Sequence, residues 1–150
     1  MDPAHAIRQA RLDAGMTQDE LAARCGLAQP NLGAYESGRR RPSEEMVVRI
    51  LAAAKPRPST ILLAHRDQVL ALARSSKASN VRVFGSIARG EDTPDSDVDL
   101  LVRFDPDASL FDLVELSDEL EALLGVHVDV LSEGGLGNGH QEIREQARPL

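Results

Sequence analysis

Two aspartates, Asp97 and Asp99, stand two residues apart within the apolar segment "DVDLLV". In a strand, side chains at this spacing point to the same face of the sheet, while Val98 and Leu100 point to the other. Asp129 lies in a second apolar segment, "VHVDVL". Carboxylates among Val and Leu are costly to bury unless a cation meets them. The pattern therefore predicts that the three carboxylates converge on one sheet face around a divalent metal.

The residues around these carboxylates indicate which substrate the metal serves. Ligation by oxygen alone favours Mg²⁺ (or Mn²⁺), held by a few carboxylates together with phosphate oxygens of a substrate. Gly85 and Ser86 precede an expected strand-to-helix turn, where a backbone without Cβ and free N–H groups can hold phosphate. Metal acids beside a phosphate site indicate phosphoryl or nucleotidyl transfer. The nearby Asp92 and Asp95 are expected only to accept backbone N–H groups.

Strands and helices alternate around this site. The sequence predicts an α/β or α+β arrangement, in which helices pack on a small sheet. The expected strands are residues 81–84, 97–104 and 126–132, and the expected helices are 59–76, 109–125 and 140–150.

The first third of the chain has a different, all-helical pattern. Short helices are expected over residues 4–15, 17–26, 28–38 and 42–54. Thr17 with Glu20 forms a capping-box pattern, and Ser43 is a good cap for the last of these helices. Short helices with a tight Gly-containing turn between the second and the third predict a helix-turn-helix bundle.

Charge divides the chain in the same way. Residues 1–57 carry nine Lys and Arg against seven Asp and Glu, whereas residues 58–150 carry eight against seventeen. The prolines of "KPRPS" mark the boundary. We therefore predict two domains, at residues 1–55 and 60–150, joined by a linker at 56–59.

Bulk composition excludes several other classes. No apolar stretch approaches the roughly 20 residues of a membrane span, and the N-terminus lacks the apolar core of a signal peptide. A single cysteine, Cys25, cannot form an internal disulfide and is expected to be a small buried side chain, which fits the cytoplasm. The four histidines show no metal-like spacing, which argues against a zinc site.

The segment "GSIARGEDTPDSDVDLLV" resembles the minimal nucleotidyltransferase (MNT) group of the polymerase-β-like nucleotidyltransferases, whose signature is Gly-Ser, ten residues, then Asp-x-Asp. The resemblance covers most of residues 60–150. It implies that Gly85 and Ser86 hold a nucleotide triphosphate and that Asp97 and Asp99 bind metal. Asp129 would complete the metal site and help to deprotonate the acceptor hydroxyl.

Arg89 follows the Gly-Ser pair and has two expected roles. It could reach a phosphate of the nucleotide, or it could form a surface salt bridge with Glu91 or Asp92.

The segment from "MTQDELAARCG" to "YESGRRRPS" resembles the phage-repressor (Xre-like) DNA-binding family over about 50 residues. In that family the third helix lies in the major groove of an operator, and the protein usually binds as a dimer. The amide of Gln29 suits a bidentate pair with adenine. The resemblance implies that base edges face Ala28, Gln29, Pro30, Asn31 and Ala34, and that the DNA backbone contacts Gln18, Arg39, Arg40 and Arg41.

The pairing of the two domains resembles the antitoxins of HEPN/MNT toxin–antitoxin systems. The resemblance implies a DNA-binding antitoxin that moves AMP from ATP to a hydroxyl of a cognate toxin, as a homodimer or hetero-oligomer. The alternatives are a nucleotidyltransferase acting on tRNA or on a small molecule, and a regulator that senses nucleotide or docks a partner without transfer. The acidic balance of residues 58–150 argues against RNA as the acceptor.

Overall fold

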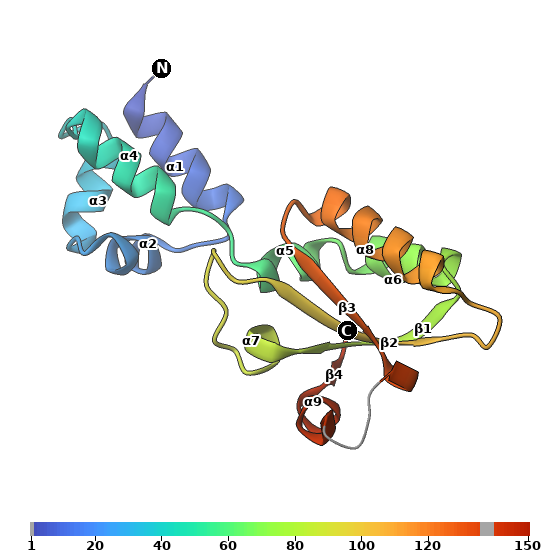
Figure 1. The fold of residues 1–150 in the computed structure, drawn as a ribbon. Coiled ribbons are helices and arrows are strands. Elements are labelled where there is room, and N and C mark those ends of the chain that lie inside the picture. The colour runs from blue at the N-terminus through green and yellow to red at the C-terminus, as the bar shows by residue number, and fades with distance from the viewer. Residues whose placement is uncertain (1, 136–139) are drawn as a thin grey trace. The chain divides into compact units, whose positions relative to one another are not determined.

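The computed structural model describes residues 2–135 and 140–150, and the chain separates into two compact units (Figure 1). The first unit is Met1–Pro56 and the second is Arg57–Leu150. Each unit has a hydrophobic core of its own. Among the described residues, no helix has both the length and the apolar character that crossing a membrane requires.

The first unit is helical. Its core contains the fully buried side chains Ile7, Leu21, Leu32 and Ile50, with one from each helix. Its helices are α1 (Pro3–Asp13), α2 (Gln18–Cys25), α3 (Gln29–Glu36) and α4 (Glu44–Ala53).

Local signals in the sequence set the ends of these helices. The capping box at the start of α2 is confirmed, since the Thr17 side chain accepts from the Glu20 N–H and the Glu20 carboxylate accepts from the Thr17 N–H. Ser43 accepts from the Met46 N–H at the start of α4. Gly26 ends α2 with a φ of +69°, a left-handed conformation that glycine adopts at little cost, and this turn leads directly into α3.

The second unit combines a sheet with helices. Its elements are α5 (Pro58–Ala64), α6 (Arg66–Ser75), β1 (Ala78–Phe84), α7 (Gly85–Ala88), β2 (Val98–Phe104), α8 (Leu110–Leu124), β3 (Val128–Ser132), the 3₁₀ turn Glu133–Gly135, α9 (Gln141–Gln146) and β4 (Arg148–Pro149).

The strands form a mixed sheet in the order β3–β2–β1–β4. β2 runs antiparallel to β1 and parallel to β3, and β4 pairs antiparallel with β1. α6 and α8 cover one face of this sheet, and Val98, Leu100 and Val102 of β2 pack with them in the core (Figure 1). The C-terminal end of β1 is therefore adjacent to the N-terminal ends of β2 and β3, at one end of the sheet.

The single helix expected over residues 59–76 is wrong, because the structure divides it at His65. His65 has a φ of −112° and a ψ of 18°, outside the helical range, and its Nδ1 lies 2.9 Å from the carbonyl oxygen of Ile61. Leu62 of α5 and Val69 of α6 are both fully buried in the same core. The bend therefore lets both segments present an apolar face to the sheet.

The helix expected over residues 140–150 is also shorter than predicted. α9 ends at Gln146, and the chain then adds β4 to the edge of the sheet. Arg148 and Pro149 pair with Val83 and Arg82 of β1. An edge strand tolerates proline, because its missing N–H is not needed by a further strand.

Candidate nucleotidyltransferase site and DNA-binding surface

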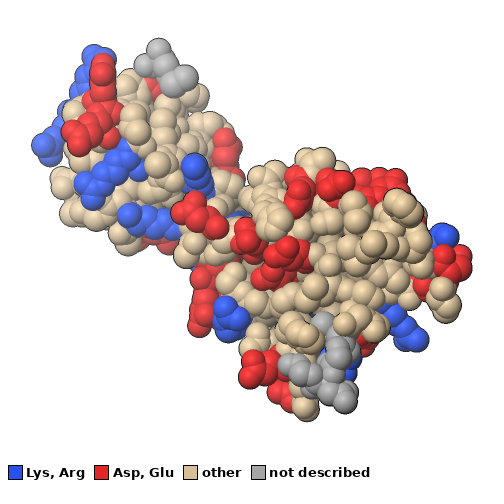
Figure 2. All heavy atoms as spheres, viewed as in Figure 1, with Lys and Arg blue, Asp and Glu red and all other residues tan. Residues whose placement is uncertain are grey.

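One side of α3 is exposed. Leu32 and Tyr35 are buried in the core of the first unit, while the side chains at the start of the helix point outwards. Of the predicted DNA-contacting residues, Ala34 and Gln18 are half-buried, and the exposed ones are Ala28, Gln29, Pro30, Asn31, Arg39, Arg40 and Arg41. In the view of Figure 2, Lys and Arg are prominent on the first unit and Asp and Glu on the second.

A chain of hydrogen bonds, which sequence reasoning missed, holds Gln29 in place. Gln29 donates to Gln18 Oε1 at 2.7 Å, and Gln18 donates to Glu36 Oε2 at 2.8 Å. Glu36 in turn accepts from Arg11 Nε at 2.6 Å and from Arg11 Nη2 at 3.1 Å. The first residue of α3 is thus connected through α2 to a charged pair within the bundle. No sequence periodicity points to Arg11 and Glu36, because they are 25 residues apart.

The Arg11–Glu36 pair is well buried, since the side chains are 12% and 4% exposed. Burial alone would raise the pKa of Glu36. The hydrogen bonds from Arg11 and Gln18, together with the charges of Arg11 and Arg8, outweigh burial and lower this pKa.

The carboxylates predicted to bind metal lie together at the end of the sheet where β1 ends and where β2 and β3 begin. Asp97 directly precedes β2 and is exposed, and Asp99 is the second residue of β2 and is half-buried. Asp99 pairs with Asp129 across the parallel strands and with Phe84 at the end of β1. Asp97 and Asp129 each place a carboxylate oxygen within 4.8 Å of the other. The structure thus brings all three carboxylates to one place.

The electrostatics of Asp99 show the cost of this arrangement without a cation. Burial raises the pKa of Asp99, and the negative charges of Asp129 and Asp97 raise it further. Arg89 opposes them only in part. A carboxylate that is disfavoured in its charged form and faces two others is suited to bind a divalent cation.

Gly85 lets the backbone come close to Asp99. A Cβ built at this position would collide with Asp99 Oδ2 and lie 3.2 Å from Cγ, and φ at Gly85 is +70°. The turn into α7 therefore requires glycine at this position for two reasons: the left-handed conformation and the lack of space for a Cβ beside the carboxylate. Ser86 follows in the first turn of α7.

Two neighbouring side chains have partners within the protein. Arg89, just after α7, pairs with Glu91 through Nε and Oε2 at 2.9 Å, which is one of the two roles expected for it. Asp92 is 5% exposed and accepts from the Ser59 N–H at 2.9 Å, as expected for a structural aspartate.

The residues of the second unit match a known family. The family model for the nucleotidyltransferase domain matches residues 66–150, which is more than half of the chain. The chain belongs to this family. The helix-turn-helix family model matches residues 7–55 of the first unit.

Relatives of the nucleotidyltransferase domain agree with this assignment. The protein adenylyltransferase MntA of Thermococcus cleftensis is 42% identical over 80 residues, which cover 53% of this chain and 78% of that protein. A solved structure described as a minimal nucleotidyltransferase is 47% identical with a TM-score of 0.56, and the match covers 61% of this chain and 95% of that one. A solved toxin–antitoxin structure with AMP-PNP is 22% identical with a TM-score of 0.50, covers 55% of this chain and 69% of that one, and supports the fold alone.

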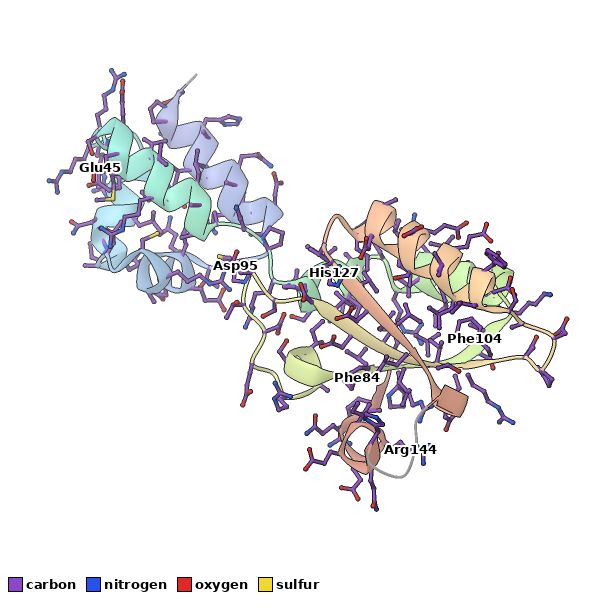
Figure 3. The ribbon with its side chains drawn as sticks, viewed as in Figure 1. Glu45, Phe84, Asp95, Phe104, His127 and Arg144 are labelled. Carbon is purple, nitrogen blue, oxygen red and sulfur yellow. The ribbon has the colours of Figure 1, made fainter. Side chains whose placement is uncertain are left out.

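The sequence analysis did not single out one residue that lies beside the three carboxylates. His127 is exposed directly before β3 (Figure 3), and its Nε2 lies 3.0 Å from Asp129 Oδ1. The hydrogen bond and charge of Asp129 raise the pKa of His127, and the charges of Glu121 and Asp97 add to this effect. The signal was present in the sequence, because residues two apart in a strand share a face, and His127 stands two before Asp129.

Proposed function

We propose that this chain is a DNA-binding antitoxin that transfers AMP from ATP to a hydroxyl group of a cognate toxin protein. The observation that carries the proposal is the meeting of Asp97, Asp99 and Asp129 beside the Gly85–Ser86 turn. Membership of the nucleotidyltransferase family supports the reaction class, and relatives named protein adenylyltransferases support AMP and a protein acceptor.

The three carboxylates fit Mg²⁺ or Mn²⁺ by their chemistry, since these ions prefer oxygen ligands. Asp97, Asp99 and Asp129 would hold the metal, which when bound would neutralise phosphate charge and stabilise the leaving group. Burial, and then the charges of Asp129 and Asp97, raise the pKa of Asp99, and this supports the assignment because a bound cation would stabilise the charged form.

Individual residues of the chain would bind the triphosphate and accept the proton during transfer. Ser86 and the first N–H groups of α7 would bind the triphosphate, and Arg89 would leave Glu91 to contact a phosphate. The acceptor hydroxyl oxygen attacks the α-phosphorus, the bond from this phosphorus to the bridging oxygen breaks, and pyrophosphate leaves with the electron pair. Asp129 would take the hydroxyl proton.

The first unit would bring this activity to its own operator. We propose that α3 enters the major groove of double-stranded DNA as part of a homodimer or of a complex with the toxin. The exposed Gln29 and Asn31 would read base edges, and the exposed arginines 39–41 would contact phosphates. The helix-turn-helix match over residues 7–55 supports this assignment.

A labelling experiment tests the transfer. The purified chain, Mg²⁺ and the protein encoded by the neighbouring gene are incubated with ATP labelled at the α- or the γ-phosphate. Nucleotidyl transfer leaves the α-label on the partner and releases the γ-label in pyrophosphate. We expect D97N and D99N to remove the α-label and D95N, which changes an exposed aspartate of the same loop, to retain it.

Other results would contradict the proposal in distinct ways. An α-label on added tRNA but not on the partner would indicate an RNA acceptor. No label on either, with operator binding intact, would indicate a regulator that binds nucleotide without transferring it. Label on the partner that persists in D99N would remove the three carboxylates from the mechanism.

A further inference from the structure

His127 is held between two carboxylates at the edge of the metal-acid cluster. Its Nε2 lies 3.0 Å from Asp129 Oδ1, and its Nδ1 lies 2.8 Å from Oε1 of Glu121. Glu121 belongs to α8 and also accepts from the Val128 N–H at 3.1 Å. The ring is thus fixed in orientation from both sides although it is exposed.

The ring nitrogen that faces the cluster is spaced as a metal ligand would be. Asp97, His127 and Asp129 each offer one ligand atom, and these atoms all lie within 4.8 Å of one another. Two neighbouring ligands that are each about 2.1 Å from one ion in octahedral geometry lie about 3.0 Å apart. The Nε2–Oδ1 separation of 3.0 Å is that of a hydrogen bond, which bonds from both atoms to an ion would replace at nearly the same separation. All three side chains are exposed, so an ion from solvent reaches them directly.

Glu121 occupies the position of an outer partner to a metal-binding histidine. Histidine ligands commonly direct their second nitrogen at a carboxylate, which fixes the ring and the proton position and raises the basicity of the ligating nitrogen. With Nδ1 beside Glu121, the nitrogen left for a metal is Nε2, which faces Asp97 and Asp129.

We propose that Asp97, His127 and Asp129 form a mixed nitrogen–oxygen site that selects a transition-metal ion such as Mn²⁺ or Co²⁺ over Mg²⁺. Imidazole adds little to the binding of Mg²⁺, which prefers oxygen, but it strengthens the binding of transition metals. This site shares Asp97 and Asp129 with the proposed catalytic metal site. The inference therefore names the ion that the transfer uses, and in this it rests on the proposed function. Glu121 is a positioning residue for His127.

Metal titration without nucleotide tests the proposal on the full chain. The dissociation constants of Mg²⁺, Mn²⁺ and Co²⁺ are measured by calorimetry for the wild type, H127Q and E121Q, and Co²⁺ binding is also followed by visible absorption. We expect H127Q to weaken Mn²⁺ and Co²⁺ binding by about tenfold or more and to change the Co²⁺ spectrum. Mg²⁺ binding should stay within about twofold, because oxygen ligands dominate it. E121Q should give a smaller loss in the same direction.

The control variant is H140Q, which changes an exposed histidine outside the site. It should bind all three ions as the wild type does. Equal weakening of Mg²⁺ and Co²⁺ in H127Q would show that His127 only orients Asp129, and unchanged binding of all ions would show that it has no role. Either result overturns the metal preference. Failure of the proposed function is seen separately, as a partner protein that acquires no α-label from the wild type.

Discussion

Asp99 of β2 and Asp129 of β3 are directly paired across two parallel strands, with Asp97 at the same end of the sheet. Neither sheet geometry nor apolar packing requires two carboxylates in register. In the absence of a cation, like charges at paired positions destabilise a sheet. The pairing therefore has consequences for stability as well as for activity.

The first prediction is that removing the charge of Asp99 stabilises the metal-free protein. Burial and the charges of Asp129 and Asp97 raise the pKa of Asp99, so D99N removes a disfavoured charge and the melting temperature at neutral pH in a chelating buffer should rise. Added Mg²⁺ should raise the melting temperature of the wild type and have little effect on D99N. The control D95N, in the exposed loop, should match the wild type. A lower melting temperature for D99N would contradict the repulsion.

The second prediction separates strain from collision at the Gly-Ser turn. Gly85 and Gly90 both have a φ of +70°, but a Cβ at Gly90 would meet nothing within 4 Å. G85A and G90A should each lose about 1 kcal/mol of unfolding free energy from the left-handed conformation. Only G85A would displace the Asp99 carboxylate, so its transfer rate should fall at least about tenfold, since misplacing a catalytic group slows the reaction strongly. Denaturant unfolding and the α-label assay measure the two effects, and equal rates in both variants would contradict the structure.

The third prediction concerns the charged pair that supports α3. E36Q leaves Arg11 buried without its counter-charge, so the first unit should lose about 3 kcal/mol of unfolding free energy at neutral pH. Tyr35 is the only tyrosine, the chain has no tryptophan, and Tyr35 is buried in this unit, so its fluorescence follows the unit selectively. The exposed Glu45 of α4 is the control, and E45Q should cost much less.

The pH dependence of this loss follows from the lowered pKa of Glu36. The charged form stabilises the fold above the unfolded pKa of glutamate, about 4.3, and this stabilisation is lost as the pH falls through the lower pKa of the folded state. The difference between wild type and E36Q should therefore be full at neutral pH and shrink below about pH 4. A difference that is independent of pH would contradict the lowered pKa.

The fourth prediction distinguishes base reading from phosphate contact on DNA. Q29A should bind the chain's own operator about tenfold or more weakly and lose preference over a scrambled duplex, because the amide no longer pairs with a base. R41A should weaken both duplexes alike and reduce the slope of log affinity against log salt by about 1. Arg41 is chosen because Arg40 stacks on Tyr35 at 5.9 Å and its loss would also affect the core. Fluorescence anisotropy at several salt concentrations measures both variants.

How far the sequence predicts the structure depends on whether a signal is local. The box of Thr17 and Glu20, the cap at Ser43 and the order β1, β2, α8, β3 follow from neighbouring residues, and the structure confirms them. The proximity of Asp97, Asp99 and Asp129 could also be predicted from the sequence, because the alternation of side chains along a strand places these acids on the same face of the sheet.

The features that were missed depend on contacts distant in sequence. The bend at His65 has no glycine or proline to mark it, and burial of residues on both sides sets it. The helix predicted over residues 140–150 includes Pro149, which instead joins the sheet by pairing with Arg82. The contact of Glu121 in α8 with His127, directly before β3, could not be predicted from the periodicity of either segment.

Adenylylation is tested most directly by the intact mass of the partner protein after incubation with this chain, ATP and a divalent metal. We expect the mass to increase by one AMP residue with the wild type and to stay unchanged with D99N. Partner protein that keeps its original mass with the wild type, while ATP and metal are shown to bind, would contradict protein adenylylation by this site.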